Sequence, residues 1–396
     1  MTMDVAAAGT AVRRGSAIND PRLRAIFYQI VLLLVVVGIG WFLVSNLIHN
    51  REVRGIQTGY GFLSREAGFA ISESPISYSP SDPYARAFLV GLVNTLQVSV
   101  LGIILATLLG LLVGVSKLST NWLLAKIATA YVDIVRNIPL PVQLLLWAGL
   151  IRVSAPPPRQ ALHPVPGVFV SNRGIQVPSL ENNPVFLWMA VAALVALVVG
   201  WGIARWARQR QAATGQPFHS FWVGLGLFIG LPLVVWLAGG APAAFEIPEL
   251  KGFNFQGGWT LTPEFAALLI GLTVYTAGFI AEIVRGGILA VSHGQTEAAR
   301  ALGLHSGTTL RRIVLPQALR TIIPPLTSQY LNVTKNSSLA VVIGYPDLVS
   351  IGNTIGNQTG QVVEAISIFM AVYLFISLSI SIAMNIYNRK MALRER

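Results

Sequence analysis

The chain has 396 residues, of which 54% are hydrophobic and only 11% are charged, and its mean hydropathy is +0.63. Soluble domains carry about 25% charged residues, so this composition excludes an ordinary soluble protein. The net charge of +12 does not indicate nucleic acid binding, because no basic patch has interleaved aromatic residues and cytoplasmic loops of membrane proteins are rich in Lys and Arg.

Eight apolar segments are long enough to cross a bilayer, which takes about 20 helical residues. A β-barrel would instead show alternating strands of about 10 residues. We therefore predict an all-α polytopic membrane protein with about eight transmembrane helices. In chain order the segments are 25–48, 86–116, 122–151, 185–205, 221–239, 262–290, 317–343 and 363–387.

The basic residues predict the orientation of these helices. With the N-terminal tail 1–24 inside, the inner segments hold about twice as many Lys and Arg as the outer ones, as the positive-inside rule requires. We expect both termini and the loop 291–316 to be cytoplasmic. The first apolar segment is too long for a signal-peptide core, so we expect it to be retained.

The predicted outer segments look extended. Residues 153–184 include three consecutive prolines from Pro156 to Pro158, which favour extended backbone. No segment between the predicted spans is long enough for a folded soluble domain of ordinary size.

The seventh segment, 317–343, is unusually polar. A Lys at the centre of a membrane helix costs about 2.5–3.5 kcal/mol on insertion scales, so this helix must face other helices or a water-filled path. We expect Pro324 and Pro325 to break or kink it. Its polar residues are Arg320, Thr327, Ser328, Gln329, Asn332, Thr334, Lys335, Asn336, Ser337 and Ser338.

Two other segments contain charged residues. Glu282 and Arg285 share a helix face, and they form either an internal ion pair or a gate that contacts a charged ligand. Arg136 and Asn137 precede two prolines, which indicates either a charged helix start or a break that exposes backbone groups to a pathway.

The loop EAARALGLHSGTTLRRIVLP, residues 297–316, predicts two short helices. Thr296 is expected to cap the first near Glu297, where the helix dipole favours a carboxylate. Gly303 would end it in a left-handed turn, and Ser306 would cap the second, over 307–315.

Small side chains protrude little from one face of the first helix, so another protein can approach this face closely. These residues are Ala298, Ala299 and Ala301. Pro316 ends the loop, and the polar segment 317–343 begins directly after it. A push on the loop would therefore move the helix that lines the path.

This spacing resembles the EAA loop of ABC importer permease subunits. The pattern is Glu297-Ala298-Ala299, three residues, Gly303, nine residues and Ile313-Val314-Leu315-Pro316. The stretches VDIVRNIPLPVQLLL, AEIVRGGI, KNSSLAVVIGYPDLV and GLVNTLQVSV resemble the polar amino-acid branch of that family. An extra N-terminal span and a large insert resemble the larger permease subunit of the general L-amino acid transporters of Gram-negative bacteria.

The resemblance implies a division of the chain around a five-helix permease core. The expected parts are the tail 1–24, an extra helix and outer loop over 25–84, the first core part 85–151, an insert with two helices over 152–259, and the second core part 260–390.

The resemblance also implies partners: a second, related permease subunit, two ATPase subunits, a periplasmic amino-acid-binding protein, membrane lipid and an L-amino acid as substrate. No GxxxxGK[ST] phosphate loop occurs, so we expect no cofactor in this chain, with ATP and Mg bound by the ATPase. The chain itself is expected not to be an enzyme, since its five His lie at loops or ends and no HExxH occurs.

Two groups of residues are therefore candidates for function. The ATPase-coupling group is Glu297, Ala298, Ala299, Gly303, Leu304, Leu315 and Pro316. The substrate-path or gate group is Arg136, Asn137, Gln143, Glu282, Arg285, Gln329, Asn332, Thr334, Lys335, Asn336, Ser337 and Ser338.

In the path group, Lys335 would donate to a substrate carboxylate and Glu282 would accept from its amine, or Lys335 would pair with a carboxylate at the subunit interface. The alternative function is an ion-gradient-driven carrier of amino acids, which predicts inverted repeats that the sequence does not show convincingly.

Overall fold

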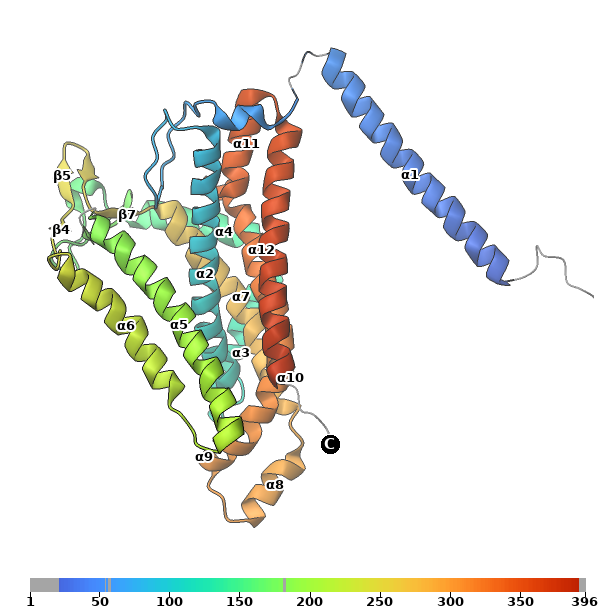
Figure 1. Ribbon diagram of the computed structural model, residues 1–396, viewed down its shortest axis with the longest axis vertical. Coiled ribbons are helices and arrows are strands. Elements are labelled where there is room, and N and C mark those ends of the chain that lie inside the picture. The colour runs from blue at the N-terminus through green and yellow to red at the C-terminus, as the bar shows by residue number, and fades with distance from the viewer. Residues whose placement is uncertain (1–20, 54, 56–57, 181–182, 392–396) are drawn as a thin grey trace, which may run out of the picture.

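The computed structural model describes residues 21–53, 55, 58–180 and 183–391 (Figure 1). Most of the tail 1–24 lies outside the described residues. Six described helices are long and apolar enough to cross a membrane, or up to eight when two bent pairs each count as one span. The all-α polytopic fold is therefore confirmed. The six are α1 (Pro21–Val53), α2 (Tyr84–Ser116), α5 (Pro184–Thr214), α6 (Ser220–Ala238), α7 (Pro263–Leu289) and α12 (Val362–Met391).

Helix α7 lies at the centre of the core and packs along α2. Small residues recur at every fourth position of α2, at Gly102, Ala106, Gly110 and Gly114, and all four are buried. A Cβ atom at Gly110 would lie 2.6 Å from Cβ of Ile280, so the two helices approach through this stripe. Close approach of small residues is a common way for membrane helices to gain packing contacts.

The third apolar segment, 122–151, was predicted as a single spanning helix, but it forms two helices. Helix α3 (Trp122–Asn137) ends at Ile138, and α4 (Leu140–Ser154) leaves it at 107°. Ile138 is extended, with φ −97° and ψ 127°, because a residue before proline is disfavoured in the helical region. Pro139 then begins the turn into α4.

The seventh segment has no break at the two prolines, where a break or a kink was predicted. Helix α10 (Leu315–Asn336) runs through Pro324 and Pro325, with its apolar face packed against α7 and α2. Proline has a helical φ and each one removes a single N–H, so this packing can hold the helix together. The chain then passes through η5 (Ser337–Ile343) into α11 (Leu348–Thr359), bent by 53°.

The end of the core opposite α8 (His293–Ala301) is closed by the segment 58–83, which contains η2 (Tyr60–Ser64). Phe62 is fully buried against α2, α11 and α12. The Asn94 side chain, on α2, donates to the backbone carbonyls of Glu73 (2.9 Å) and Pro346 (2.8 Å). The first bond ties the segment to α2, and the second ties α2 to the turn before α11.

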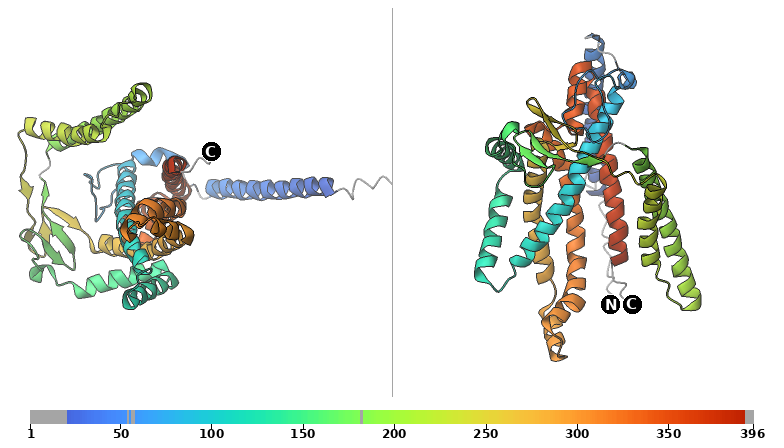
Figure 2. Two further views of the ribbon diagram at one scale, coloured as in Figure 1. Left: turned by 90° about the horizontal axis from the view of Figure 1, so that it is seen from below. Right: turned by 90° about the vertical axis from the view of Figure 1, so that its left-hand side faces the viewer.

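The insert contains strands that the sequence did not predict. It forms three small antiparallel sheets, of which β1-β2-β7 and β3-β4 pair its two halves, whereas β5-β6 is a hairpin within the second half. The α5–α6 hairpin is carried by these sheets and lies apart from the core, as α1 also does (Figures 1 and 2). After η3 (Pro158–Gln160) the strands are β1 (Phe169–Ser171), β2 (Gly174–Val177), β3 (Ser179–Leu180), β4 (Phe245–Glu246), β5 (Glu249–Lys251), β6 (Asn254–Gln256) and β7 (Trp259–Leu261).

Candidate functional site

Residues 293–314 form a compact unit, here called the coupling block, at the end of the bundle below α7 and α10 (Figure 1). Its first helix, α8, ends in a Schellman turn. The Gly303 N–H donates to the Arg300 carbonyl (2.9 Å) and the Leu304 N–H to the Ala299 carbonyl (3.1 Å). Gly303 has φ +72°, so the predicted left-handed turn at this glycine is confirmed.

The predicted helix starts are wrong. Helix α8 begins at His293, four residues before Glu297, so Glu297 lies in the second turn and Thr296 caps nothing. The next helix, α9 (Ser306–Thr309), is preceded by His305, and the Ser306 side chain makes no cap bond. The prediction placed each cap at a residue of a suitable type. The start of α8 instead depends on where the chain leaves α7.

The coupling block continues into α10 without an interruption. Helix α9 passes into a π-helical turn, η4 (Leu310–Val314), in which the Leu315 N–H donates to the Leu310 carbonyl. Pro316 follows in the first turn of α10. Because proline lacks an N–H and its ring crowds the carbonyl four residues earlier, a local widening of the helix accommodates it. A displacement of α9 would therefore move α10.

The exposed surface of the coupling block combines polar, small and leucine side chains. The Glu297 side chain is 67% exposed and lies 3.0 Å from Nδ1 of His293. Ala299 faces inward at 1% exposure, whereas Ala298 is exposed. Among the other coupling candidates, Leu304, Leu315 and Pro316 are exposed.

Helix α10 exposes a polar face along its length. Thr321, Ser328, Asn332 and Lys335 are exposed and recur at helical spacing, whereas Ile322, Leu326 and Val333 on the other side are buried. We call these four residues the polar face of α10. In a bilayer such a face requires contact with protein or water, since lipid cannot solvate it.

Several predicted path hydroxyls are already bonded to their own helix. Thr334 and Ser337 are buried, and they donate to the carbonyls of Tyr330 (3.1 Å) and Thr334 (2.7 Å). Ser338 donates to the Lys335 carbonyl (2.6 Å). Gln329 and Asn336 are half-buried. Within this conformation Asn332 and Lys335 are the path candidates on α10 that lie most open to a ligand.

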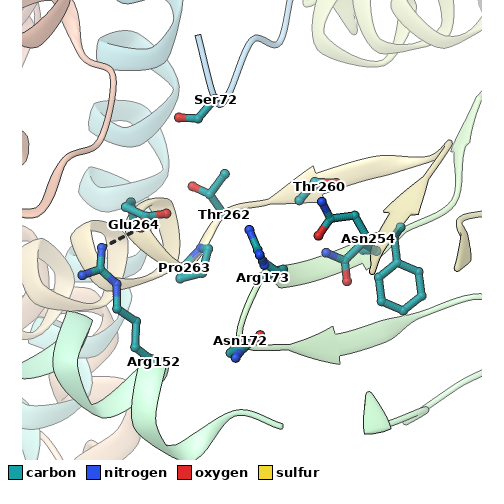
Figure 3. A pocket seen from close by; sticks show the side chains of 11 residues that line it. Ser72, Arg152, Asn172, Arg173, Asn254, Thr260, Thr262, Pro263 and Glu264 are labelled. Carbon is teal, nitrogen blue, oxygen red and sulfur yellow. Dashed lines mark hydrogen bonds and ion pairs between the residues drawn. The ribbon is translucent and has the colours of Figure 1, made fainter. Parts of the chain in front are cut away.

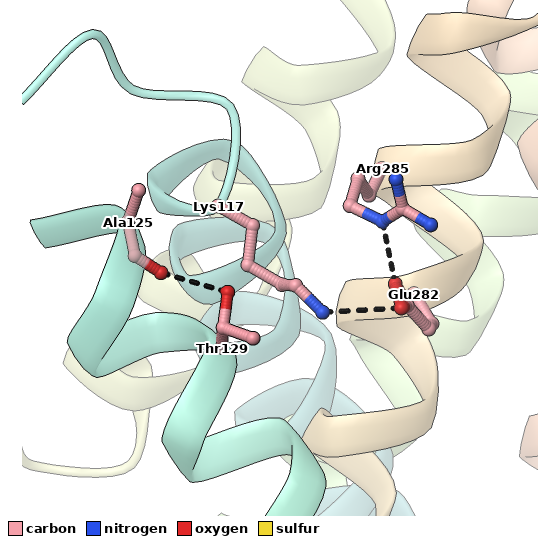
Figure 4. A network of polar contacts seen from close by, with 5 residues as sticks. All are labelled: Lys117, Ala125, Thr129, Glu282 and Arg285. Carbon is pink, nitrogen blue, oxygen red and sulfur yellow. Dashed lines mark hydrogen bonds and ion pairs between the residues drawn. The ribbon is translucent and has the colours of Figure 1, made fainter. Parts of the chain in front are cut away.

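Glu282 takes part in a three-residue charge network (Figure 4). It accepts from Arg285 on its own helix (2.8 Å) and from Lys117 at the end of α2 (3.1 Å). The ion pair with Arg285 was one of the two readings of the sequence, and the structure shows this pair. Lys117, whose side chain is only 7% exposed, was missed because it lies 165 residues away in the chain.

The two candidates for holding a substrate zwitterion lie far apart. Val333 and Leu272 both lie beside Gly102, within 3.9 Å of a Cβ placed there, so Lys335 is near the level of Leu272. Glu282 is ten residues further along α7, about 15 Å at 1.5 Å per residue. The carboxylate and amine of one amino acid cannot span that distance, so within one subunit these residues do not bind the same molecule at once.

The remaining path candidates lie around the α3–α4 break. Gln143 is buried and donates to the carbonyls of Val135 (2.8 Å) and Ile138 (3.0 Å), which the end of α3 leaves free. Arg136 is exposed, with its guanidinium 5.0 Å from the centre of the Phe279 ring, and Asn137 is exposed beside it. Gln143 therefore stabilises the break, and a role for these residues in the path stays a prediction.

A family described as "Binding-protein-dependent transport system inner membrane component" matches residues 100–394. Over 388 residues the chain is 48% identical to the general L-amino acid transport system permease protein AapQ of Rhizobium johnstonii, with 98% of this chain and 97% of that protein covered.

Over 417 residues the chain is 42% identical to the glutamate/glutamine/aspartate/asparagine transport system permease protein BztB of Rhodobacter capsulatus, with 97% of each protein covered. A solved amino acid ABC transporter with histidines is 22% identical at a TM-score of 0.46, with 78% of this chain and 95% of that chain covered. Both permeases match nearly their whole length, including the insert.

Proposed function

The chain belongs to the family of inner membrane components of binding-protein-dependent transport systems, and from this membership we propose that it is a permease subunit of an ATP-driven importer of L-amino acids. Its partners in this proposal are a second, related permease, two ATPase subunits and a periplasmic amino-acid-binding protein. Both termini and the coupling block face the cytoplasm. ATP and Mg are bound by the ATPase subunits.

One observation carries the proposal: the coupling block is joined to α10 by an uninterrupted helical run from Ser306 to Asn336. An ATPase that binds the surface around Glu297 and closes on ATP would push the block. Helix α8, which carries Glu297, packs against α9 and η4 across the turn at Gly303, and from Ser306 onward the run is helical, so the push is transmitted to the polar face of α10. The chain thereby couples a cytoplasmic movement to the path.

The polar face of α10 supports a paired permease. Thr321, Ser328, Asn332 and Lys335 are exposed in the single subunit and would be unsatisfied against lipid. Apposition of a related subunit would enclose them in a shared path near the membrane midplane, which is where alternating-access transporters bind substrate. A change in the angle between the two subunits would open this path to one side at a time.

The test is a reconstitution of the chain in liposomes with the products of its neighbouring genes. ATP-dependent uptake of labelled L-amino acid should require the ATPase subunits and the binding protein. Glu297→Gln should lower stimulated ATP hydrolysis and uptake together, because it removes an exposed charge that we assign to the ATPase contact.

His293→Ala is the matched control, since it removes only the partner of Glu297 on α8 and leaves the carboxylate in place. It should retain most of the activity. Uptake driven by an ion gradient in liposomes without any ATPase subunit would refute the proposal and support the carrier.

A further inference from the structure

A polar pocket of about 720 Å³ lies where the insert meets the core (Figure 3). It is beside β7 and the start of α7, away from the end of the core that carries α8 (Figure 1). Its volume is in the range of small-molecule sites. Four parts of the chain that are distant in sequence build it: the segment before α2, the end of α4, the start of α7 and the sheets of the insert. Its polar side chains are Ser72, Arg152, Asn172, Arg173, Gln176, Asn254, Thr260, Thr262 and Glu264.

The charge of this pocket is set by Arg173. Arg152 donates to Glu264 at 2.7 Å, so these two charges neutralise each other. Glu73, behind Thr262, is buried, and burial raises its pKa to about 7, so it carries only part of a negative charge at neutral pH. Arg173 has no acidic partner among the residues that the structure describes, and it leaves the pocket positive.

The backbone at Arg173 is fixed. Asn172 and Arg173 form the two-residue turn between β1 and β2, and the Arg173 N–H donates to Oγ of the buried Ser171 (3.2 Å). Gly174, at φ +113°, lies so close to β7 that a Cβ would come within 2.2 Å of the Leu261 carbonyl. The backbone that carries Arg173 is therefore held against β7, and it need not be ordered when a ligand binds.

Neutral hydrogen-bonding side chains line the pocket near Arg173, which is itself exposed. Arg173 points into the pocket between Thr262 and the strand that carries Asn254, with Thr260 and Asn172 beside it (Figure 3). Arginine presents paired N–H groups that match the two oxygens of a carboxylate, and amide and hydroxyl side chains can complete the shell.

We propose that this pocket is a carboxylate-binding site on the extracytoplasmic face, centred on Arg173 and built mainly by the insert. Its ligand is either the α-carboxylate of a free amino acid or a carboxylate side chain that the binding protein inserts. The proposal rests on the proposed function, which places this pocket on the extracytoplasmic side and supplies both the amino acid and the binding protein. It gives the insert a role in receiving substrate before the path along α10.

Two measurements on Arg173→Gln separate the sources. The first is binding of L-alanine to the permease pair in lipid nanodiscs without binding protein, with L-alaninamide, which lacks the carboxylate, as the comparison ligand. The second is the binding-protein concentration that gives half-maximal ATPase stimulation in the full assembly. We expect a weakening of at least about tenfold in one of the two, since a hydrogen-bonded charge is lost.

Arg159→Gln is the matched control. Arg159 is an exposed arginine of the same insert that stacks on Phe253 at 4.5 Å and does not line the pocket. It should leave both measurements unchanged, and Arg173→Lys should weaken the affected one less than Arg173→Gln does.

If Arg173→Gln weakens binding of L-alanine but not of L-alaninamide, the site binds the substrate. If it raises the binding-protein concentration needed for half-maximal ATPase stimulation, the site binds the binding protein. If Arg173→Gln matches wild type in both measurements, or if Arg159→Gln is equally impaired, the carboxylate site is refuted. In contrast, a wild-type assembly that imports no amino acid refutes the proposed function, while the nanodisc measurement still reports on the pocket.

Discussion

Substitution of Gly287 by alanine should destabilise the protein, whereas the same change at the adjacent Gly286 should not. Both glycines lie on α7. A Cβ at Gly287 would come within 2.2 Å of Cγ1 of Ile322 on α10, but a Cβ at Gly286 meets nothing within 4 Å in this chain. The pair therefore changes the same residue type on the same helix with opposite steric consequences.

The magnitude follows from the distance. Carbon atoms pack at about 3.5–4.0 Å, so the new methyl group falls short of contact distance by at least about 1.3 Å. Ile322 is 2% exposed, and its β-branched side chain is stiff, so it cannot turn away. Overpacking costs about 1–3 kcal/mol, and the higher helix propensity of alanine recovers at most about 1 kcal/mol.

The assay is thermal or SDS unfolding of the purified protein, with Gly287→Ala, Gly286→Ala and each change combined with Ile322→Ala. Gly287→Ala alone should unfold first. When Ile322→Ala is already present, Gly287→Ala should lower the stability little or even raise it, because its methyl group then fills space that the isoleucine occupied. Equal stability of Gly287→Ala and Gly286→Ala would refute the close contact between α7 and α10.

Three further changes test other parts of the molecule. Glu282→Gln should destabilise by about 1–3 kcal/mol in unfolding assays, because Lys117 is left with a nearly buried charge, and adding Lys117→Met should restore most of the loss. Lys335→Ala should abolish uptake while the assembly and ATP hydrolysis stay intact, and a loss of assembly alone would contradict a role in the path. Burial holds the pKa of Glu73 at about 7, above its ordinary 4.5, so the folded state binds the proton more tightly and wild-type stability should fall as pH rises from about 4.5 to about 7, by up to about 3 kcal/mol. Glu73→Gln should remove that slope in unfolding midpoints measured across this range, and an unchanged slope would exclude Glu73 as its source.

Features that depend on one stretch of sequence were largely predicted. The apolar segments give the spanning helices, and the left-handed turn at Gly303 follows from the conformational freedom of glycine. The polar residues of 317–343 predicted a helix that cannot face lipid, and Thr321, Ser328, Asn332 and Lys335 form an exposed face on it. Local composition and spacing are enough for these properties.

Two signals were present in the sequence and were not used fully. The recurrence of Gly102, Ala106, Gly110 and Gly114 at every fourth residue of α2 indicates the face that packs on α7. Pro139, after Ile138, indicates the end of α3, and this was treated as only one of two alternatives. Both are short-range patterns with a known steric cause.

The sequence by itself determined a mainly helical membrane chain, the turn at Gly303 in the coupling block and the polarity of α10, because each depends on residues within one or two turns of each other. Only the tertiary structure decided that Lys117 pairs with Glu282, that Glu282 and Lys335 are too far apart to hold one amino acid, and that Arg173 lines a pocket with α4 and α7. These relations join residues far apart in the chain. The strands that place Arg173 are three or four residues long, and β2 pairs with β7 across the α5–α6 hairpin. So short a strand carries too weak a local preference to be recognised, and its position is fixed by packing.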